Sequence, residues 1–277
     1  MDIKLLQDTP PWDWPRDARK MFKKTLLDRR AKPSDRLIAA ELAGNMVAIN
    51  DELADALLST ASSPDEPAEL RAATAISLGP ALEQAYEEEF TDPDDVPISE
   101  DMFHRVRESL HKLYLDESNP KEVRRRALEG SVRAPEQWHE DAIRLAYSSR
   151  DREWMLTAVF AMGYVRGFDE QILESLKSGD AEIHLHAVNA AGTWEVEGAW
   201  PHVAALVKDS RTPKPLVFAA IEAVASIRPA EARDVLGHLT RSKDEEIAEV
   251  ALEAIHMAEG MEDTEDDEDD EVGEWIN

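Results

Sequence analysis

The sequence contains no cysteine, and this absence excludes several kinds of chemistry at once. Without thiols the chain can form no disulfide, no thiolate metal site and no cysteine nucleophile. Aromatic residues are also scarce, at 6% of the 277 residues, whereas hydrophobic residues make up 43%. Alanine and leucine dominate the hydrophobic set. That composition favours close-packed helices over a β-sandwich.

Long apolar runs and nucleotide-binding motifs are absent as well. No run of 18 apolar residues occurs, and the first residues lack the layout of a secretory signal. We therefore expect a cytoplasmic protein with no membrane segment, although the lack of cysteine is equally compatible with the periplasm. Neither phosphate-binding glycine motif nor the G-x-S-x-G nucleophile elbow is present.

Positive charge is in short supply, and its distribution is uneven. The formal net charge is −28 at pH 7. Residues 1–36 carry a net +4 and residues 261–277 a net −10, which leaves −22 on residues 37–260. A body this acidic repels phosphates, so we expect no nucleic-acid partner. A basic protein or peptide is the better electrostatic match.

What the sequence does contain is an internal repeat. A thirteen-residue frame begins at residues 32, 67, 120, 151, 180, 213 and 244. Its eighth positions are Ala39, Thr74, Ala127, Ala158, Ala187, Ala220 and Ala251. Successive eighth positions are 29 to 35 residues apart, except for one interval of 53 that marks an insertion.

Each frame has the pattern of a tightly packed helix. Positions 4, 8, 11 and 12 share one face at helical spacing, as in Ile183, Ala187, Ala190 and Ala191. A small eighth residue allows a neighbouring helix to approach closely. Helix starts are expected at an aspartate that opens a frame, or at an N-cap followed by proline, as in 119–120 and 212–213.

Second amphipathic segments lie between the frames. They span residues 50–60, 98–115, 137–149, 169–178, 200–209 and 231–241. A frame and its second segment form a helical hairpin of roughly 30 residues, a size typical of α-solenoid units. We therefore predict an all-α fold, a right-handed α-α superhelix of about six to seven stacked hairpins.

The frame D-x-x-[VI]-[RH]-x-x-A-x-x-A-x-G resembles the HEAT-like repeat of the PBS-lyase type. Asp180, Ile183, Ala187, Ala190 and Gly192 fit it, and the resemblance covers about residues 32–260. It implies an α-solenoid scaffold more often than an enzyme. The arginine frequent at the family's fifth position appears in only three frames, at residues 36, 71 and 124, so an Asp–Arg ladder is incomplete and is assigned no role.

The chain divides into three predicted parts. Residues 1–31 form an N-terminal segment with a capping helix, 32–260 the solenoid, and 261–277 a disordered acidic tail. The capping helix is basic, and an alternative role for it is docking on an acidic partner. Trp12 and Trp14 are expected to cover the first repeat, the alternative being a docking peptide. A solvated acidic loop is expected at 87–101; Asp92 and Asp94 suggest calcium there, but the glycine and terminal glutamate of an EF-hand are missing.

Partner-binding residues are expected on the second helices, which usually line the concave face of such solenoids. Their aromatic and charged members are Trp138, His139, Arg144, Tyr147, Lys177, Trp200, His202, Arg233 and His238. Trp, Tyr and Arg are enriched at binding hot spots. In the alternative interpretation, the two tryptophans only begin their helices and cover adjacent hairpins.

Histidine spacing argues against a metal centre or other cofactor. His184 and His186 fall on nearly opposite helix faces, and His104 and His111 are too far apart for one ion. Among enzymes with HEAT-like repeats, deoxyhypusine hydroxylase holds di-iron with several His-Glu pairs, and this sequence has one. The HEAT-like alkylpurine glycosylases need a cationic surface for DNA, and nothing specifically supports the bilin chemistry of the phycobilin lyases.

We therefore predict a non-enzymatic, monomeric scaffold that binds a basic protein or peptide on its concave surface. One alternative is a ligand-binding or lyase-like enzyme that uses the same groove, around residues 138, 139 and 202. A second alternative is an acidic DNA mimic that inhibits a nucleic-acid-binding protein.

Overall fold

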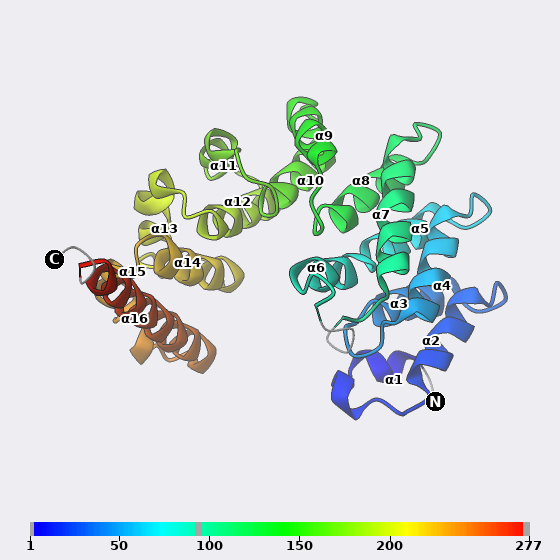
Figure 1. Ribbon diagram of the computed structural model, residues 1–277, viewed down its shortest axis with the longest axis horizontal. Coiled ribbons are helices and arrows are strands. Elements are labelled where there is room, and N and C mark those ends of the chain that lie inside the picture. The colour runs from blue at the N-terminus through cyan, green and yellow to red at the C-terminus, as the bar shows by residue number, and fades with distance from the viewer. Residues whose placement is uncertain (1–2, 92–95, 274–277) are drawn as a thin grey trace. The chain divides into compact units, whose positions relative to one another are not determined.

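The structure is a computed structural model that describes residues 3–91 and 96–273, with side chains as far as residue 260. Every regular element in these ranges is a helix, so the all-α prediction is confirmed for the described part of the chain (Figure 1). Contacts within the chain define two compact units, Met1–Leu145 and Ala146–Asn277. This division was not anticipated from the sequence.

The first unit is built from helical hairpins. Its elements are α1 (Ile3–Gln7), the 3-10 helix η1 (Pro11–Asp13), α2 (Ala18–Leu27), α3 (Pro33–Ala43), α4 (Asp51–Ser62), α5 (Ala68–Ile76), α6 (Gly79–Glu87), α7 (Glu100–Leu115), α8 (Lys121–Ser131) and most of α9 (Gln137–Ser148). Helix α5 packs between α3 and α8 in one layer, and α4 packs between α2 and α7 in the other. Each hairpin contributes one helix to each layer.

The second unit is also built from helical hairpins, with shorter second helices. Its elements are α10 (Arg152–Met162), α11 (Asp169–Ser175), α12 (Ala181–Thr193), η2 (Glu197–Ala199), α13 (Trp200–Leu206), α14 (Lys214–Ile227), α15 (Pro229–Leu236), η3 (Leu239–Arg241) and α16 (Glu245–Gly273). Helix α12 packs between α10 and α14, and α14 also packs on α16. Stacked helical hairpins are therefore confirmed within each unit.

The eighth position of the frame lies at the centre of these contacts. All seven eighth-position side chains have an exposed fraction of 0%. Six are alanine, and the hydroxyl of the seventh, Thr74, donates to the backbone oxygens of Leu70 and Arg71 at 3.0 and 2.9 Å. A threonine is tolerated there because its one polar group is satisfied inside its own helix.

Glycines near the frame's end bring backbones into direct contact. A Cβ on Gly130 would lie 2.7 Å from the carbonyl oxygen of Ala75, on the neighbouring helix. A Cβ on Gly192 would lie 3.0 Å from the Cα of Ala223. The helices that carry successive frames are therefore so close at Gly130 and Gly192 that any side chain there would crowd the neighbouring backbone.

The fifth-position arginines have a role that the sequence analysis did not assign. In all three frames that carry one, its Nε donates to the carbonyl oxygen ten residues earlier, at the end of the preceding helix. The pairs are Arg36 with Leu26 at 2.8 Å, Arg71 with Ala61 at 2.9 Å, and Arg124 with Tyr114 at 2.8 Å. Backbone carbonyls that a helix end leaves unpaired are satisfied in this way.

Two of these guanidinium groups also reach forward to the next hairpin. Arg36 pairs with Glu66 at 2.6 Å, and Arg71 donates to Asn119 Oδ1 at 2.6 Å. The second unit uses the frame's second position instead, where Arg152 pairs with Asp180 and Lys214 with Asp244. A polar link between successive hairpins is therefore present in both units, with different residues.

Helix starts agree with prediction in some frames and differ in others. Asp151 and Asp180 are N-caps whose carboxylates accept backbone N–H groups, as expected. In α8 and α14 the N-cap is the proline, 120 or 213, rather than the residue before it. The reason is that each proline has an extended ψ near 140°, so the helix begins one residue later.

The insertion is longer than the loop predicted from the sequence. Helix α6 is an additional element between the two helices of its hairpin, and it packs on α7 and α8. The calcium hypothesis concerned Asp92 and Asp94, which lie outside the described residues.

The two ends differ in how they compare with prediction. Helix α2 buries Ala18, Phe22 and Leu26 and packs on α3 and α4. Trp14 covers this first hairpin as expected, with its ring edge-on to Phe22 at 5.1 Å. Trp12 does not, because 80% of its surface is exposed, and that part of the prediction is wrong.

At the C-terminus the sequence predicts disorder for 261–277, whereas the structure continues α16 to Gly273. Residues 274–277 lie outside the described residues. A helix long and apolar enough to cross a bilayer is not found among the residues that the structure describes.

Replacing Gly130 by alanine should destabilise the first unit, because the new methyl group meets the carbonyl oxygen of Ala75 at 2.7 Å. We expect a loss of about 1–3 kcal/mol in the free energy of unfolding, the usual cost of overpacking. Gly260→Ala is the control, since a Cβ there meets nothing within 4 Å. Urea unfolding followed by circular dichroism measures both, and equal stability of the two variants would contradict the close-contact argument.

Candidate functional site

The predicted partner-binding residues are divided between the two units. Trp138, His139 and Arg144 belong to the first unit, on α9. The other six belong to the second unit. Tyr147 lies in the last turn of α9, and the other five lie on α13 and α15 or just beyond the ends of α11 and α15. Each residue is therefore considered within its own unit.

His139 is not a surface residue, and its place in the predicted site is wrong. Its exposed fraction is 0%. Trp138 stacks against it with ring centroids 3.7 Å apart, and also against His111 at 4.1 Å and Tyr114 at 5.4 Å. The tryptophan therefore seals the α7–α9 contact, which is the structural alternative that the sequence left open.

The buried histidine also touches a serine, an arrangement that suggests nucleophilic catalysis. Nε2 of His139 lies 3.0 Å from Oγ of Ser131, and Nδ1 accepts the backbone N–H of Glu136 at 2.8 Å. Because Nδ1 is the acceptor, a neutral ring carries its proton on Nε2 and donates to the serine. A general base needs the opposite tautomer. The pair is thus a satisfied core hydrogen bond.

Burial lowers the pKa of His139 to about 4 from the ordinary 6.5. The ring is therefore neutral at physiological pH, as its hydrogen bonds require.

Arg144 and Tyr147 lie further along α9 and are held by neighbouring carboxylates. Arg144 pairs with Glu140 at 2.8 Å and with Asp141 at 3.2 Å, both on its own helix. In the second unit, the hydroxyl of Tyr147 donates to Glu174 on α11 at 2.9 Å. Burial raises the pKa of Tyr147, and the hydrogen bond to Glu174 and the charge of that carboxylate add to the effect, against a lowering by the hydrogen bond from Ser175. The tyrosine therefore presents a protonated hydroxyl beside an acidic helix.

Trp200 is covered by a cation of its own chain. The guanidinium of Arg228 lies 4.9 Å from the ring centroid, within cation–π range. The same arginine pairs with Glu197 and Glu231, and its hydrogen bond to Glu197 lowers the pKa of that carboxyl group. These contacts hold α13 against α14 and α15, so Trp200 also has the structural role.

His202 forms a pair that sequence reasoning missed. Its Nε2 lies 2.7 Å from Nε2 of His184, so one ring donates to the other. Burial lowers the pKa of both rings, and for His184 the neighbouring imidazole adds to the effect. The available signal was that His184 replaces the fifth-position arginine, but nothing local indicated a partner 18 residues away.

The remaining predicted residues lie nearer the surface. His238 is exposed, with its two ring nitrogens 3.0 and 3.1 Å from the carbonyl oxygens of Val235 and Val207. Arg233 is exposed and pairs with Glu259 of α16. Lys177 is exposed just beyond the end of α11. Most of the predicted residues therefore connect elements of their own unit.

Three carboxylates of α11 are exposed and lie within one short helix. Asp169, Glu170 and Glu174 are exposed, and none of them pairs with a lysine or arginine among the described residues. Glu174 accepts the Tyr147 hydroxyl, so the acidic face has an aromatic ring beside it. We call Asp169, Glu170, Glu174 and Tyr147 the α11 acidic face.

The described residues contain no group of three or more His, Asp or Glu side chains placed to hold a metal ion. The His184–His202 pair offers only two side chains, fewer than the three that such a site needs.

Comparisons with known proteins add little to this geometry. No protein family matches the sequence, and no curated protein does. The chain is similar to a solved engineered protein at 21% identity and a TM-score of 0.36, covering 89% of this chain and 98% of that one. It is also similar to human deoxyhypusine hydroxylase, solved with glycerol, at 17% identity and a TM-score of 0.39, covering 87% and 96%. At these values neither likeness supports a statement about function.

The neutral, buried state of His139 predicts a pH dependence of stability. Because its pKa falls from 6.5 to about 4 on folding, the unfolded chain binds more protons between these values. The histidine's contribution is complete above pH 6.5 and is lost as the pH falls, by about 3 kcal/mol in total.

His139→Gln keeps a neutral hydrogen-bonding side chain and should remove this contribution. The test measures the free energy of unfolding by urea from neutral pH to about pH 4. We expect a shallower loss of stability in the variant than in the unmodified chain over this range. Parallel curves would show that the histidine is not the group that titrates.

Proposed function

We propose that this protein is a helical-repeat scaffold of the PBS-lyase HEAT-like type that binds a basic protein or peptide without catalysing a reaction. It acts as a monomer, in the cytoplasm. The observation that carries the proposal is the α11 acidic face, whose carboxylates are exposed and unpaired with cations among the described residues.

The charged groups that remain after internal ion pairing are mostly carboxylates. Arg144, Arg152 and Arg228 all contact carboxylates of their own unit. The chain holds 31 Lys and Arg against 59 Asp and Glu, so pairing consumes cations and leaves carboxylates in excess. A partner with lysine or arginine side chains complements this surface, and phosphate does not.

Tyr147 makes the acidic face suited to a basic side chain. An aromatic ring attracts a cation to its face, and tyrosine is a residue type enriched at binding hot spots. Its hydroxyl is already fixed on Glu174, which reduces the ordering cost when a partner arrives. A lysine or arginine of the partner would meet carboxylates and ring together.

The enzyme alternative has less support from the geometry. Its proposed groove relied on His139, which is fully buried and donates to Ser131. The DNA-mimic alternative requires a nucleic-acid-binding protein as the partner, and this protein would also be basic. Identification of the captured partner distinguishes a DNA-binding protein from other basic proteins.

Neutralising the acidic face should weaken binding of a basic probe. We expect Asp169→Asn, Glu170→Gln and Glu174→Gln together to raise the Kd of a labelled oligolysine peptide about tenfold. This magnitude assumes roughly 0.5 kcal/mol for each exposed ion pair. Fluorescence anisotropy measures the Kd, and binding should weaken as ionic strength rises from about 0.05 to about 0.5 M.

The matched control removes the same number of negative charges, but from α14 and α16. Glu222, Glu249 and Glu253 are exposed, and they are replaced together by glutamine. This control should bind the probe as the unmodified chain does. If both triple variants weaken binding equally, only net charge is involved and the α11 acidic face is not the site. Binding that is insensitive to salt would also contradict the proposal.

A further inference from the structure

Trp12 is one of several large hydrophobic side chains that the described residues leave exposed. Its exposed fraction is 80%, the highest among the exposed large hydrophobic side chains of the described residues. Val47, in the segment between α3 and α4, is also 53% exposed. Tryptophan is among the residue types enriched at binding hot spots.

The position of Trp12 is fixed although its side chain is exposed. It lies in η1, which Pro10 precedes and Pro11 begins. Two residues later, Trp14 is anchored through Nε1, which donates to the carbonyl oxygens of Leu6 and Thr9 at 3.1 and 2.9 Å. A backbone held at both sides of the ring presents it at a low entropic cost to a partner.

A pocket of about 230 Å³ opens beside this ring. Trp12, Trp14 and Val47 are among its apolar walls, and Arg16 and Arg19 are its charged ones. Nη2 of Arg19 donates to the carbonyl oxygen of Val47 at 3.1 Å, which ties the two walls together. The volume lies below the roughly 300–1,000 Å³ of sites for whole small ligands, so it suits one side chain of a peptide.

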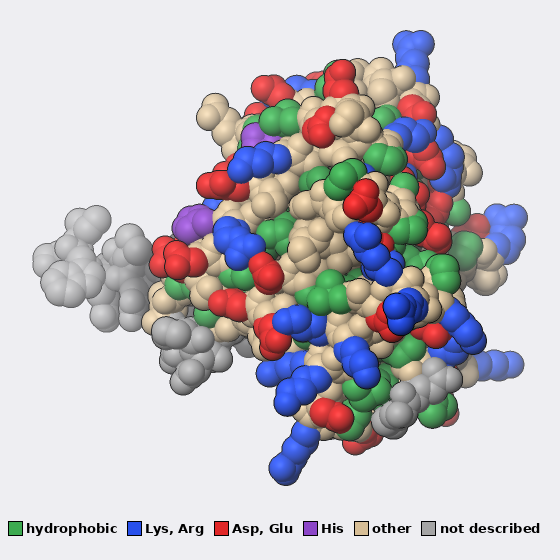
Figure 2. Space-filling model, turned by 90° about the vertical axis from the view of Figure 1, so that its right-hand side faces the viewer, with side chains coloured by type: hydrophobic (Ala, Val, Ile, Leu, Met, Phe, Trp, Pro, Cys, Tyr) green, Lys and Arg blue, Asp and Glu red, His purple; other side chains and the backbone are tan. Residues whose placement is uncertain are grey.

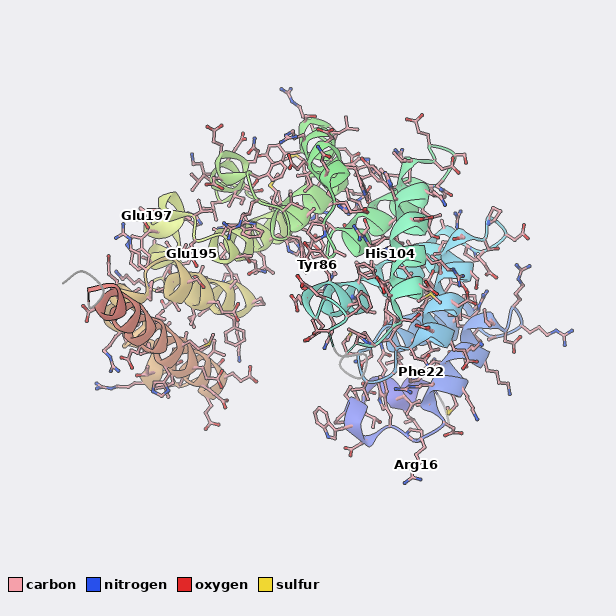
Figure 3. All side chains as sticks on the ribbon, viewed as in Figure 1. Arg16, Phe22, Tyr86, His104, Glu195 and Glu197 are labelled. Atoms are coloured by element: carbon pink, nitrogen blue, oxygen red, sulfur yellow. The ribbon has the colours of Figure 1, made fainter. Side chains whose placement is uncertain are left out.

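Both charged residues that line the pocket, Arg16 and Arg19, are basic, in a chain whose net charge is −28. Residues 16–36 carry nine Lys and Arg against three acids. Asp13 and Asp17 are neighbours in the sequence, but they do not line the pocket. Lysine and arginine side chains gather in the lower part of the face in Figure 2, and Arg16 projects away from the ribbon in Figure 3.

We propose that this pocket binds an acidic segment of another protein. An aromatic or large aliphatic side chain of that segment occupies the apolar space against Trp12 and Trp14. Its flanking carboxylates pair with Arg16 and Arg19, whose guanidinium groups match carboxylate geometry. This site is opposite in charge to the α11 acidic face and does not depend on it.

The test uses the full chain and a labelled peptide in which one tryptophan is flanked by glutamates. Trp12→Ala should raise the Kd of this peptide at least tenfold, because the ring forms a pocket wall. Arg16→Gln should raise it about threefold, as expected for one exposed ion pair. Both side chains are exposed, so neither change should unfold the protein.

Leu115→Ala is the matched control, since Leu115 is 59% exposed on a different helix of the same unit. It should leave the Kd unchanged. A peptide with alanine in place of its tryptophan should bind at least tenfold more weakly. Equal effects of Trp12→Ala and Leu115→Ala, or tighter binding of a lysine-flanked peptide, would overturn the proposal.

One competing occupant belongs to the chain itself. The segment 261–277 has ten acids, no Lys or Arg, and a tryptophan at position 275. If a copy of this segment fills the pocket, Trp275→Ala will lower the Kd of the added peptide more than threefold. That result would overturn the assignment to another protein, whereas an unchanged Kd supports it. The neutralised α11 variant should bind the peptide as before, so this proposal and the proposed function fail separately.

Discussion

The structure depends on close contact between the first helices of successive hairpins. At the eighth position of the frame, where these helices meet, the side chain is never larger than threonine. All seven eighth-position residues are fully buried, and Gly130 and Gly192 bring backbone against backbone. A single hairpin cannot bury both of its faces, so these short contacts form the continuous core of each unit. Once the helices are this close, their ends have little access to water. The fifth-position arginines then satisfy the carbonyl groups at those ends.

This use of cations inside the repeat determines the electrostatics of the surface. Arginines that cap helix ends or link successive hairpins are paired with groups of their own chain. Since acids outnumber bases almost twofold, exposed carboxylates remain, and those of α11 lie beside a fixed tyrosine. The N-terminal region is the exception, because Arg16 and Arg19 line a pocket there whose wall includes the exposed Trp12. Two surfaces of opposite charge are consistent with a scaffold that holds more than one partner.

The predicted site residues show why binding residues are harder to predict than a fold. Trp, His and Arg are favoured at interfaces because they stack and form several hydrogen bonds. The same properties make them useful between helices, and Trp138, His139 and Trp200 are used in that way. Tyr147 has an internal contact as well as a place on the proposed surface. Residue type alone does not separate these roles, because both depend on what lies opposite the side chain.

The sequence by itself determined the helices, their pairing into hairpins and the residues at the centre of each contact. These follow from local periodicity, since a helix presents the same face every 3.6 residues wherever it lies. Only the tertiary structure decided the partners of the polar and aromatic groups. Arg71 donates to Asn119, and His184 contacts His202. The loops that separate these partners have lengths that helical periodicity does not determine. The tautomer of His139 and the exposure of Trp12 likewise depend on neighbours brought together by folding, and these are the features from which function was inferred.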